Sequence, residues 1–357
     1  MIKRLEKLVL RSRLGYLVYR IVLWWHYCRD CSEIDSAIKK YCGNGLSNVQ
    51  FRRMRRRVRS VIIRYGWCPM EYFIYNYDAK SPRERRQMVG EFEKHWFAFR
   101  VNSQRSIQIF NQKWDTYQHF KKYYGREIIK VTKETHVSEF DEFVKKHNSF
   151  ILKPLSSSMG RGVRKVDVQQ DQPIDSLFNS LLEENPKGFL AEELIIQDPS
   201  MAILHPQSVN TMRVNTLRTK DGVLVFKPSI RIGRGDSVVD NAGAGGIFAK
   251  IDENTGEIEK VFDEYKHLYE IHPDTGFKLI GYRVPHMDEA KALAAELMDV
   301  LQDCAYVGWD LGLTPNGWVM VEGNVEAQFT FQIFEECGFR DDFSKILKQI
   351  KINRGNR

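Results

Sequence analysis

Two acidic residues are predicted to stand opposite each other in a hairpin near the end of the chain. The stretch "GWDLGLTPNGWVMVEGN" favours a three-residue loop at "PNG", because proline suits the first turn position and glycine the left-handed residue that closes the loop. In that register Thr314 faces Trp318, and Asp310 lies directly across from Glu322, with Asn324 on the same face as Glu322. Opposed residues have Cβ atoms about 4.5–5.5 Å apart, where like charges repel. A positive charge is therefore expected between the two carboxylates.

The side chains of Asp310, Glu322 and Asn324 all offer oxygen donors. Mg²⁺ prefers carboxylate and amide oxygens in octahedral geometry and completes its shell with water and substrate phosphates. The hairpin therefore predicts a magnesium site. The alternative is a solvated surface hairpin whose two acids splay apart.

A lysine followed by a Ser/Gly loop forms a second candidate site. In "FILKPLSSSMGRGVRKV" an apolar strand ends at Lys153, and small residues then allow backbone N–H groups to surround phosphate oxygens. No Gly-Lys-Ser/Thr sequence follows, so this is not a Walker loop. An ordinary Gly-rich turn is the alternative. The candidate phosphate-binding residues of the loop are Ser156, Ser157, Ser158, Gly160 and Gly162.

The stretch "GFLAEELI" supplies a third candidate site. It predicts a strand with Glu192 and Glu193 followed by Leu194 and Ile195. Backbone groups at the end of such a strand can bind the edge of an adenine, and a carboxylate can accept from its amino group. An ordinary strand end with a charged rim is the alternative.

The chain is long enough for two or three domains, and its basic charge is unevenly spread. It has 357 residues, of which 43% are hydrophobic and 12% aromatic, so substantial cores are expected. Residues 1–120 hold 24 Lys and Arg against 10 Asp and Glu, whereas the remainder holds 30 against 36. The basic surface is therefore N-terminal, and the acids of the candidate site lie in the other part.

The sequence has no run of about 18 apolar residues and no cleavable secretory pattern at its start. Its six scattered cysteines do not resemble a disulfide framework, which agrees with a reducing compartment. A cytoplasmic protein is expected. "HYCRDC" offers His26, Cys28 and Cys31 to a metal, but no second CxxC accompanies it, so free thiols are favoured over a zinc site.

The N-terminal region combines an apolar stripe with a run of arginines. Residues 14–25 predict an amphipathic helix with Leu14, Leu17, Val18, Ile21, Trp24 and Trp25 on one face. "RRMRRRVR" then places six arginines in eight residues, so an anionic membrane surface is a candidate partner. The favoured alternative is a helix docked on its own domain beside a solvated basic face. Nucleic acid is not expected as a partner, because no motif for it accompanies the charge.

The elements between these motifs predict an α+β chain. "SPRERRQMVGEFEKHW" opens with a capping box, Ser81 with Glu84, and "NQKWDTYQHFKKYYG" predicts a helix from Asn111 as cap to Gly125 as terminator. "SFILKP", "GVLVFKPSIRIG" and "GWVMVEGN" predict strands, "DENTG" and "HPDTG" predict turns, and residues 288–302 predict a helix. A helical basic front is thus followed by a mixed body.

The motifs occur in an order that resembles the ATP-grasp superfamily. The order runs from the lysine of "NQKW" through "FILKPLSSSMGRG" and "AEELI" to "GWDLGLTPNGWVMVEGN", over residues 111 to about 330. The phrases "NTMRV", "PSIRIGRG" and "DNAGAGG" are similar to its sugar-transfer-associated branch, found among bacterial polysaccharide genes. Joint occurrence in this order is far more specific than any single motif.

The resemblance implies an ATP site with a role for each motif. Lys113 and Lys153 are similar to the two lysines that bind ATP phosphates, and Glu192 with the backbone of 193–195 is similar to the adenine clamp. Asp310, Glu322 and Asn324 match the ligands of Mg²⁺, which would supply the positive charge between the two acids.

The implied fold has two α/β subdomains that clasp ATP behind the helical basic region. The expected division is a basic helical domain at 1–110, a first subdomain with the phosphate loop at 111–190, a second subdomain with the adenine clamp and metal site at 191–335, and a C-terminal helix or tail at 336–357. The usual α/β front domain of the family is not evident in the first 110 residues.

The resemblance implies an ATP- and Mg²⁺-dependent ligase that joins a carboxylate to an amine through an acylphosphate, in bacterial polysaccharide or glycoconjugate biosynthesis. A kinase acting on a hydroxyl and a non-catalytic nucleotide-binding scaffold are the alternatives. Many such ligases carry an arginine just before the first metal acid, but the sequence here is "YVGWD". Arg213 and Arg231 are the candidates to replace it, structural ion pairs being the alternative, and Asn241 lies in a loop that could close over the acceptor.

Overall fold

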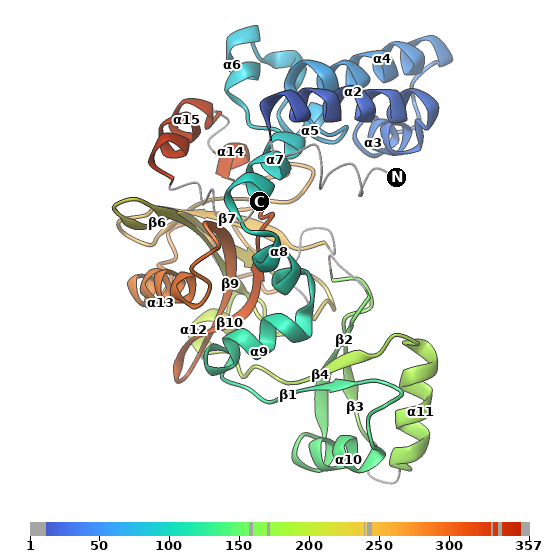
Figure 1. Cartoon of the computed structure of the whole chain (residues 1–357), viewed down its shortest axis with the longest axis vertical. Coiled ribbons are helices and arrows are strands. Elements are labelled where there is room, and N and C mark those ends of the chain that lie inside the picture. The colour runs from blue at the N-terminus through green and yellow to red at the C-terminus, as the bar shows by residue number, and fades with distance from the viewer. Residues whose placement is uncertain are drawn as a thin grey trace.

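The computed structural model describes residues 12–156, 160–169, 172–238, 240, 245–329, 331–334 and 338–350. Figure 1 shows a helical N-terminal part at one end of the long axis, a six-stranded sheet in the middle, and a four-stranded sheet with two helices at the other end. Ser157, Ser158 and Asn241 lie outside the described residues. The expected α+β architecture with a helical N-terminal region is confirmed.

The N-terminal part is built from short helices with local start and stop signals. Ser47 and Gln50 form a capping box, and Gly66 ends the same helix in the left-handed region. The predicted capping box of Ser81 and Glu84 is also present, although its helix stops at Gln87. The helices are α2 (Arg13–Arg29), α3 (Ser32–Cys42), α4 (Asn48–Tyr65), α5 (Glu71–Ile74), η1 (Tyr77–Ala79), α6 (Pro82–Gln87), α7 (Glu91–Val101), α8 (Gln104–Asn111) and α9 (Lys113–Tyr124).

The predicted helix over residues 14–25 is α2, but most of its apolar stripe does not dock. The face of α2 that packs on the domain carries Tyr19, Leu23 and Tyr27, which are buried together with residues of α4 and α7. The other face, with Leu14, Leu17, Val18, Ile21 and Trp25, is exposed. The expectation that this stripe is docked on its own domain is therefore wrong for these five side chains.

Helix α9 begins one residue later than the sequence suggested. Asn111 is the last residue of α8, and Gln112 is the N-cap of α9, which places Lys113 at its first position. Gly125 ends α9 with φ 58°, as predicted. The Thr116 hydroxyl lies 2.8 Å from the Ile109 carbonyl and 3.1 Å from the Gln112 carbonyl, and these contacts join α8 to α9.

The four-stranded sheet is antiparallel and has the order β1-β4-β2-β3. Helices α10 and α11 pack on it through phenylalanine and leucine side chains. Phe140 and Phe178 of the helices lie in the same core as Phe150 and Phe189 of the sheet. Strand β2 coincides with the predicted "SFILKP" strand. The elements are β1 (Ile128–Val131), α10 (Val137–Lys146), β2 (Ser149–Pro154), β3 (Arg164–Asp167), α11 (Ile174–Glu184) and β4 (Phe189–Glu193).

The six-stranded sheet has the order β10-β9-β5-β6-β7-β8, and all of its pairings are antiparallel. Helix α13 packs through Ala290, Ala294 and Leu297 in the same core as β5, β6 and β9. Its elements, with the short helices around it, are α12 (Pro199–Ala202), β5 (Thr211–Thr219), β6 (Gly222–Ile232), β7 (Ile247–Ile251), β8 (Ile258–Phe262), α13 (Met287–Val300), β9 (Tyr306–Thr314), β10 (Gly317–Asn324), α14 (Phe331–Phe334) and α15 (Arg340–Gln349).

The β9–β10 hairpin reaches the predicted pairing by a different route. Thr314 pairs with Gly317, so the loop has two residues, and the expected pairing of Thr314 with Trp318 is wrong. A bulge between Met320 and Glu322 then adds one residue to β10, after which Glu322 does pair with Asp310. The two offsets cancel, and the acids stand opposite each other as expected.

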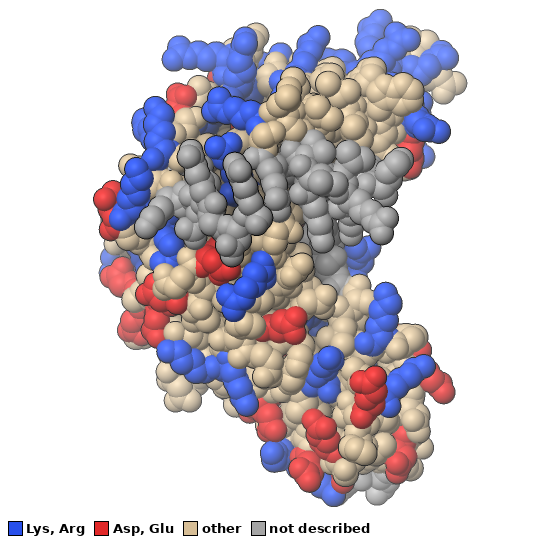
Figure 2. All heavy atoms as spheres, viewed as in Figure 1, with Lys and Arg blue, Asp and Glu red and all other residues tan. Residues whose placement is uncertain are grey.

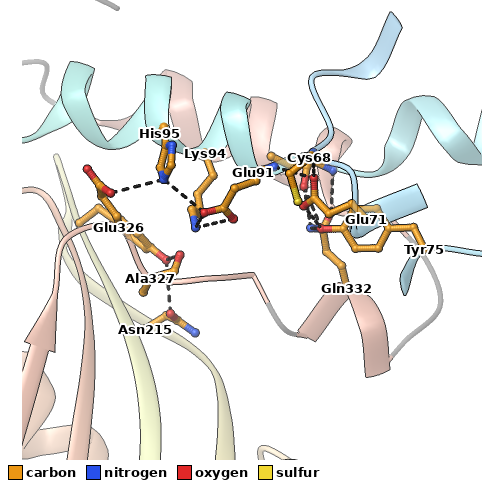
Figure 3. A network of polar contacts seen from close by, with 12 residues as sticks. Cys68, Glu71, Tyr75, Glu91, Lys94, His95, Asn215, Glu326, Ala327 and Gln332 are labelled. Carbon is orange, nitrogen blue, oxygen red and sulfur yellow. Dashed lines mark hydrogen bonds and ion pairs between the residues drawn. The ribbon is translucent and has the colours of Figure 1, made fainter. Parts of the chain in front are cut away.

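The N-terminal helices are joined to the chain that follows β10 by polar contacts (Figure 3). His95 of α7 lies 3.2 Å from Glu91 and 3.3 Å from Glu326. The Gln332 side chain accepts from the N–H of Val89 at 2.8 Å and donates to its carbonyl at 3.0 Å. In the described part of the chain, no helix is both long and apolar enough to cross a membrane.

Candidate nucleotide and metal site

Lys113, Lys153 and Glu192 come together from helix α9 and from strands β2 and β4 of the four-stranded sheet. Lys153 Nζ lies 2.9 Å from the Glu192 carboxylate, and Lys113 Nζ donates to the Pro154 carbonyl at 3.0 Å. Burial lowers the pKa of Lys113, whose ammonium also interacts with Glu322, Lys153 and Glu192. The two predicted phosphate-binding lysines therefore lie close enough to act on one polyanion.

Glu192 is held by cations on two sides. The Arg126 guanidinium donates to its carboxylate at 2.8 and 3.2 Å, in addition to the contact with Lys153. Burial would raise the pKa of Glu192, but Lys153 and Arg126 together hold it below its ordinary value. The carboxylate is thus ionised and paired, and its predicted contact with an adenine amino group stays a prediction.

The predicted adenine clamp is only partly available in this arrangement. The N–H of Glu193 donates to the Glu127 carbonyl at 2.9 Å, and its carboxylate accepts from the Glu127 N–H at 2.8 Å. Strand β4 ends at Glu193, so Leu194 and Ile195 follow it as a half-buried loop. The role of these two backbone groups remains a prediction.

Asp310 lies on β9, next to the edge strand β10 of the six-stranded sheet, and binds two arginines. Its carboxylate accepts from Arg213 Nε and Nη2 at 2.6 and 2.8 Å and from Arg231 Nη1 at 3.0 Å. Arg213 pairs directly with Asp310 across β5 and β9, which explains the bidentate geometry. Burial would raise the pKa of Asp310, but the two arginines hold it below its ordinary value. The positive charge expected beside Asp310 is provided here by guanidinium groups.

Glu322 differs from Asp310 although the two stand opposite each other. Its side chain is exposed, with no ion pair to any described residue, whereas Asp310 is 4% exposed. Asn324 is half-buried and pairs with Gly308 across the same hairpin. One acid of the hairpin is therefore fixed in place, and the other is open to an incoming ligand.

The two halves of the site face each other. Lys153 of the four-stranded sheet acts electrostatically on Asp310 of the six-stranded sheet, and Glu322 acts on Lys113. Arg126 links the two sheets through hydrogen bonds. Its guanidinium binds the Glu192 carboxylate of β4 and also donates to the Met320 carbonyl of β10 at 2.9 Å. Lys113 of α9, Lys153 of β2 and the two acids of the hairpin thus line a common space.

The described part of the predicted phosphate loop has the backbone that such a loop needs. Gly160 and Gly162 have φ of 72° and 74°, which a side chain would strain. A Cβ at Gly162 would also lie 3.0 Å from the Pro154 ring. Pro154 is the residue whose carbonyl binds Lys113, so the loop folds back toward the lysine pair.

Comparison with known proteins decides the family. The sugar-transfer associated ATP-grasp profile matches residues 93–349, which is well over half of the chain. The chain belongs to this family. The match extends beyond residues 111–330 at both ends, so the sequence motifs marked too short a span. No curated protein matches the chain.

Solved structures similar to this ATP-grasp chain include ligases at low identity. N5-carboxyaminoimidazole synthase from Aspergillus clavatus, in complex with ADP and 5-aminoimidazole ribonucleotide, is 14% identical with a TM-score of 0.41, over 69% of this chain and 54% of that one. The D-alanine–D-alanine ligase from Coxiella burnetii is 10% identical with a TM-score of 0.44, over 71% and 60%. The chain thus spans little more than half the length of these structures.

The oxygen donors of the ATP-grasp hairpin fit a magnesium ion. A carboxylate has about four lone-pair positions. Three on Asp310 are occupied by the two arginines, which leaves one for a further ligand. Glu322 and Asn324 add exposed and half-exposed oxygens on the opposite strand. No group of three or more His, Cys, Asp or Glu side chains among the described residues is arranged to hold a metal ion, and the five described cysteines are free thiols.

Two residues of this site were not identified from the sequence. Arg126 follows a helix terminator, and nothing local marks it as the link between the sheets. Asp240 opens the "DNAGAGG" stretch, where it accepts hydrogen bonds from both the N–H and the hydroxyl of Thr211. Burial raises the pKa of Asp240 to about 6, and Arg231 acts against that rise. The acid at the start of a glycine-rich loop was the available signal.

Proposed function

We propose that the chain is an ATP- and Mg²⁺-dependent ligase that joins a carboxylate to an amine through an acylphosphate. It would act in bacterial cell-surface polysaccharide or glycoconjugate biosynthesis, in the cytoplasm or at the inner face of the membrane. The observation that carries this proposal is the arrangement of charges: Lys113 of α9 and Lys153 of the four-stranded sheet act electrostatically on the hairpin acids Glu322 and Asp310, respectively. Triphosphate binding requires such a set, since phosphoryl transfer depends on positioning and on neutralising spread charge.

Each group has a role that its surroundings support. Lys113 and Lys153 would bind the phosphates, and Glu192 with Arg126 holds Lys153 in place. Asp310, Glu322 and Asn324 would hold Mg²⁺. When bound, Mg²⁺ screens the phosphate oxygens and stabilises the charge that develops on them.

The two arginines replace the one that many ligases carry before the first metal acid. That position holds Trp309, which is fully buried and donates to Thr216. Arg213 is fixed by its two bonds to Asp310, whereas Arg231 gives one nitrogen to this carboxylate and has a more exposed side chain. We assign Arg231 to the acceptor carboxylate and Arg213 to positioning. Because a guanidinium is thus supplied from the neighbouring strands, the ligase is favoured over the kinase.

Trapping with hydroxylamine tests this proposal. The protein is incubated with ATP, Mg²⁺, hydroxylamine and a panel of sugar acids and amino acids, and hydroxamate and ADP are measured. The correct acid should give both products in equal amounts, because hydroxylamine attacks the acylphosphate. ADP with a stable phosphate ester and no hydroxamate would instead establish the kinase. Nucleotide binding without ADP release across the panel would support the scaffold.

A matched pair of variants shows whether the signal comes from this site. Lys153→Met removes a proposed phosphate ligand and should abolish both products. Lys187→Met removes an exposed lysine for which the described residues provide no partner, and it should leave both products unchanged. Equal loss in the two variants would contradict the assignment of Lys153.

A further inference from the structure

The outward face of α4 forms a basic groove. Helix α4 contains seven arginines and no acid. Its outward residues, together with Tyr77 and Arg85, line a groove with a volume of about 720 Å³. Figure 2 shows Lys and Arg side chains gathered at this end of the molecule, over α4 and α6. The arginines of the groove are Arg52, Arg53, Arg56, Arg57, Arg64 and Arg85.

The arginines of α4 divide into those with fixed partners and those without. On the inner side Arg55 forms two bonds to Asp35, and Arg59 contacts Cys31. On the outer side Arg57 pairs with Asp78. For the other four outward arginines, the described residues provide no hydrogen bond or ion pair; these are Arg52, Arg53, Arg56 and Arg64. Four guanidinium groups on one face thus lack a counter-charge from the described part of this protein.

Large apolar side chains are exposed beside these arginines. Val49 lines the groove and is 61% exposed, and Ile63 of the same helix face is also exposed. On α2, which packs against α4, Leu14 is 72% and Trp25 59% exposed. Exposure of apolar side chains to water is unfavourable. The combination of cations and apolar groups therefore points to a partner that offers both anions and hydrocarbon.

We propose that the outer face of α4, with the exposed stripe of α2, binds the surface of an anionic phospholipid bilayer. From Arg52 to Arg64 the helix extends about 18 Å at 1.5 Å per residue, which is longer than a single phosphate and suits a row of headgroups. Arginine side chains match phosphate oxygens, and Trp and Leu enter the boundary between headgroups and acyl chains. A nucleic acid backbone would satisfy the arginines but not the apolar stripe.

This interaction does not depend on the reaction proposed above. Figure 1 places α4 at one end of the long axis and the four-stranded sheet with α10 at the other. A bilayer bound on α4 would therefore leave that sheet in solution. Vesicle binding and hydroxamate formation are measured separately, so one proposal can fail without the other.

Vesicle flotation tests the charge requirement. The full chain is mixed with phosphatidylcholine vesicles that contain 0 or about 30% phosphatidylglycerol, at low and at high salt. We expect binding only to anionic vesicles, and weaker binding at high salt. Each arginine near such a surface strengthens binding about fivefold, so Arg52→Gln with Arg56→Gln should weaken it roughly 25-fold. The matched control is Lys133→Gln with Lys187→Gln, which removes the same charge from exposed positions of the four-stranded half and should change binding little.

Quenching of Trp25 fluorescence tests the apolar contact. Brominated lipids should quench part of the tryptophan emission of the wild-type chain, and this part should be missing in Trp25→Leu, which keeps an apolar side chain and still binds. Equal loss of binding in the arginine pair and the lysine pair would overturn the proposal. So would equal binding to neutral vesicles, or a polynucleotide or a second copy of the chain bound through these arginines with no vesicle bound.

Discussion

Loss of charge at the two acids of the hairpin should have different effects: at Asp310 it should reduce stability, and at Glu322 it should weaken metal binding. Asp310 is buried and forms three hydrogen bonds with Arg213 and Arg231. Asp310→Asn keeps the shape of the side chain but leaves two buried guanidinium groups side by side. Removing one partner of a buried ion pair costs about 3–5 kcal/mol. Because both arginines lose the same partner, we expect the upper half of this range.

Glu322→Gln should leave the stability almost unchanged. Glu322 is exposed and has no ion pair to a described residue, and surface substitutions of this kind usually change the free energy of unfolding by less than about 0.5 kcal/mol. Its effect should fall on metal binding instead. Loss of even an outer partner of a metal site costs about 10–100-fold in affinity or activity, so loss of a direct ligand should cost at least about 100-fold.

Two measurements separate these effects. Urea unfolding followed by circular dichroism gives the stability of each variant, and calorimetric titration with ATP at several Mg²⁺ concentrations gives nucleotide affinity. Glu183→Gln, on an exposed helix position, is the control for loss of an acid. The reasoning is refuted if Glu322→Gln unfolds as easily as Asp310→Asn. It is equally refuted if Glu322→Gln binds ATP with the Mg²⁺ dependence of the wild-type chain.

Three further predictions follow from buried charges elsewhere. Arg126→Met should cost about 3 kcal/mol in urea unfolding, because it leaves the buried Glu192 carboxylate with Lys153 but without Arg126, and Arg126→Met combined with Glu192→Gln should cost less than the sum of the two single changes. Burial raises the pKa of Asp240 to about 6, so its contribution to stability falls as the pH rises from about 4 to 6, and Asp240→Asn should remove this fall from the urea midpoints. Burial lowers the pKa of His95, but Glu91 raises it above its ordinary value overall, so the stability lost in His95→Gln should be larger at pH 6 than at pH 9.

The sequence predicted the strands of the site well because their signals are local. Alternating apolar residues bounded by turn residues define β2 and β10 to the residue. The predicted pairing of Asp310 with Glu322 was right, but it depends on a bulge that the local sequence did not indicate. The bulge that corrects the register lies after Met320, whose carbonyl accepts from Arg126 at 2.9 Å. Those two residues are 194 positions apart, so no short pattern could predict the contact.

The sequence also could not show which face of a helix packs on the domain, or which acid an arginine binds. The helical period located α2, but hydrophobicity alone ranked the stripe with Leu14 and Trp25 above the face that docks. The docked face carries Tyr19 and Tyr27. Because of its hydroxyl, tyrosine counts as less hydrophobic than leucine or tryptophan, although its ring buries a large area. Likewise, Arg213 was predicted to meet an anion, and only the pairing of β5 with β9 shows that this anion includes Asp310.

The helical N-terminal region is part of the structure that positions the two acids of the hairpin. Asn102, the C-cap of α7, accepts from the N–H groups of Ala305 and Tyr306 at 2.8 Å and donates to the Tyr306 carbonyl, so α7 fixes the start of the strand that carries Asp310. Contacts of His95 with Glu326 fix the chain just after the partner strand (Figure 3). Both strands of the hairpin are therefore anchored at the end away from their turn. Since a metal site tolerates only small errors in ligand position, this anchoring gives the helices before the hairpin a positioning role in the proposed metal site.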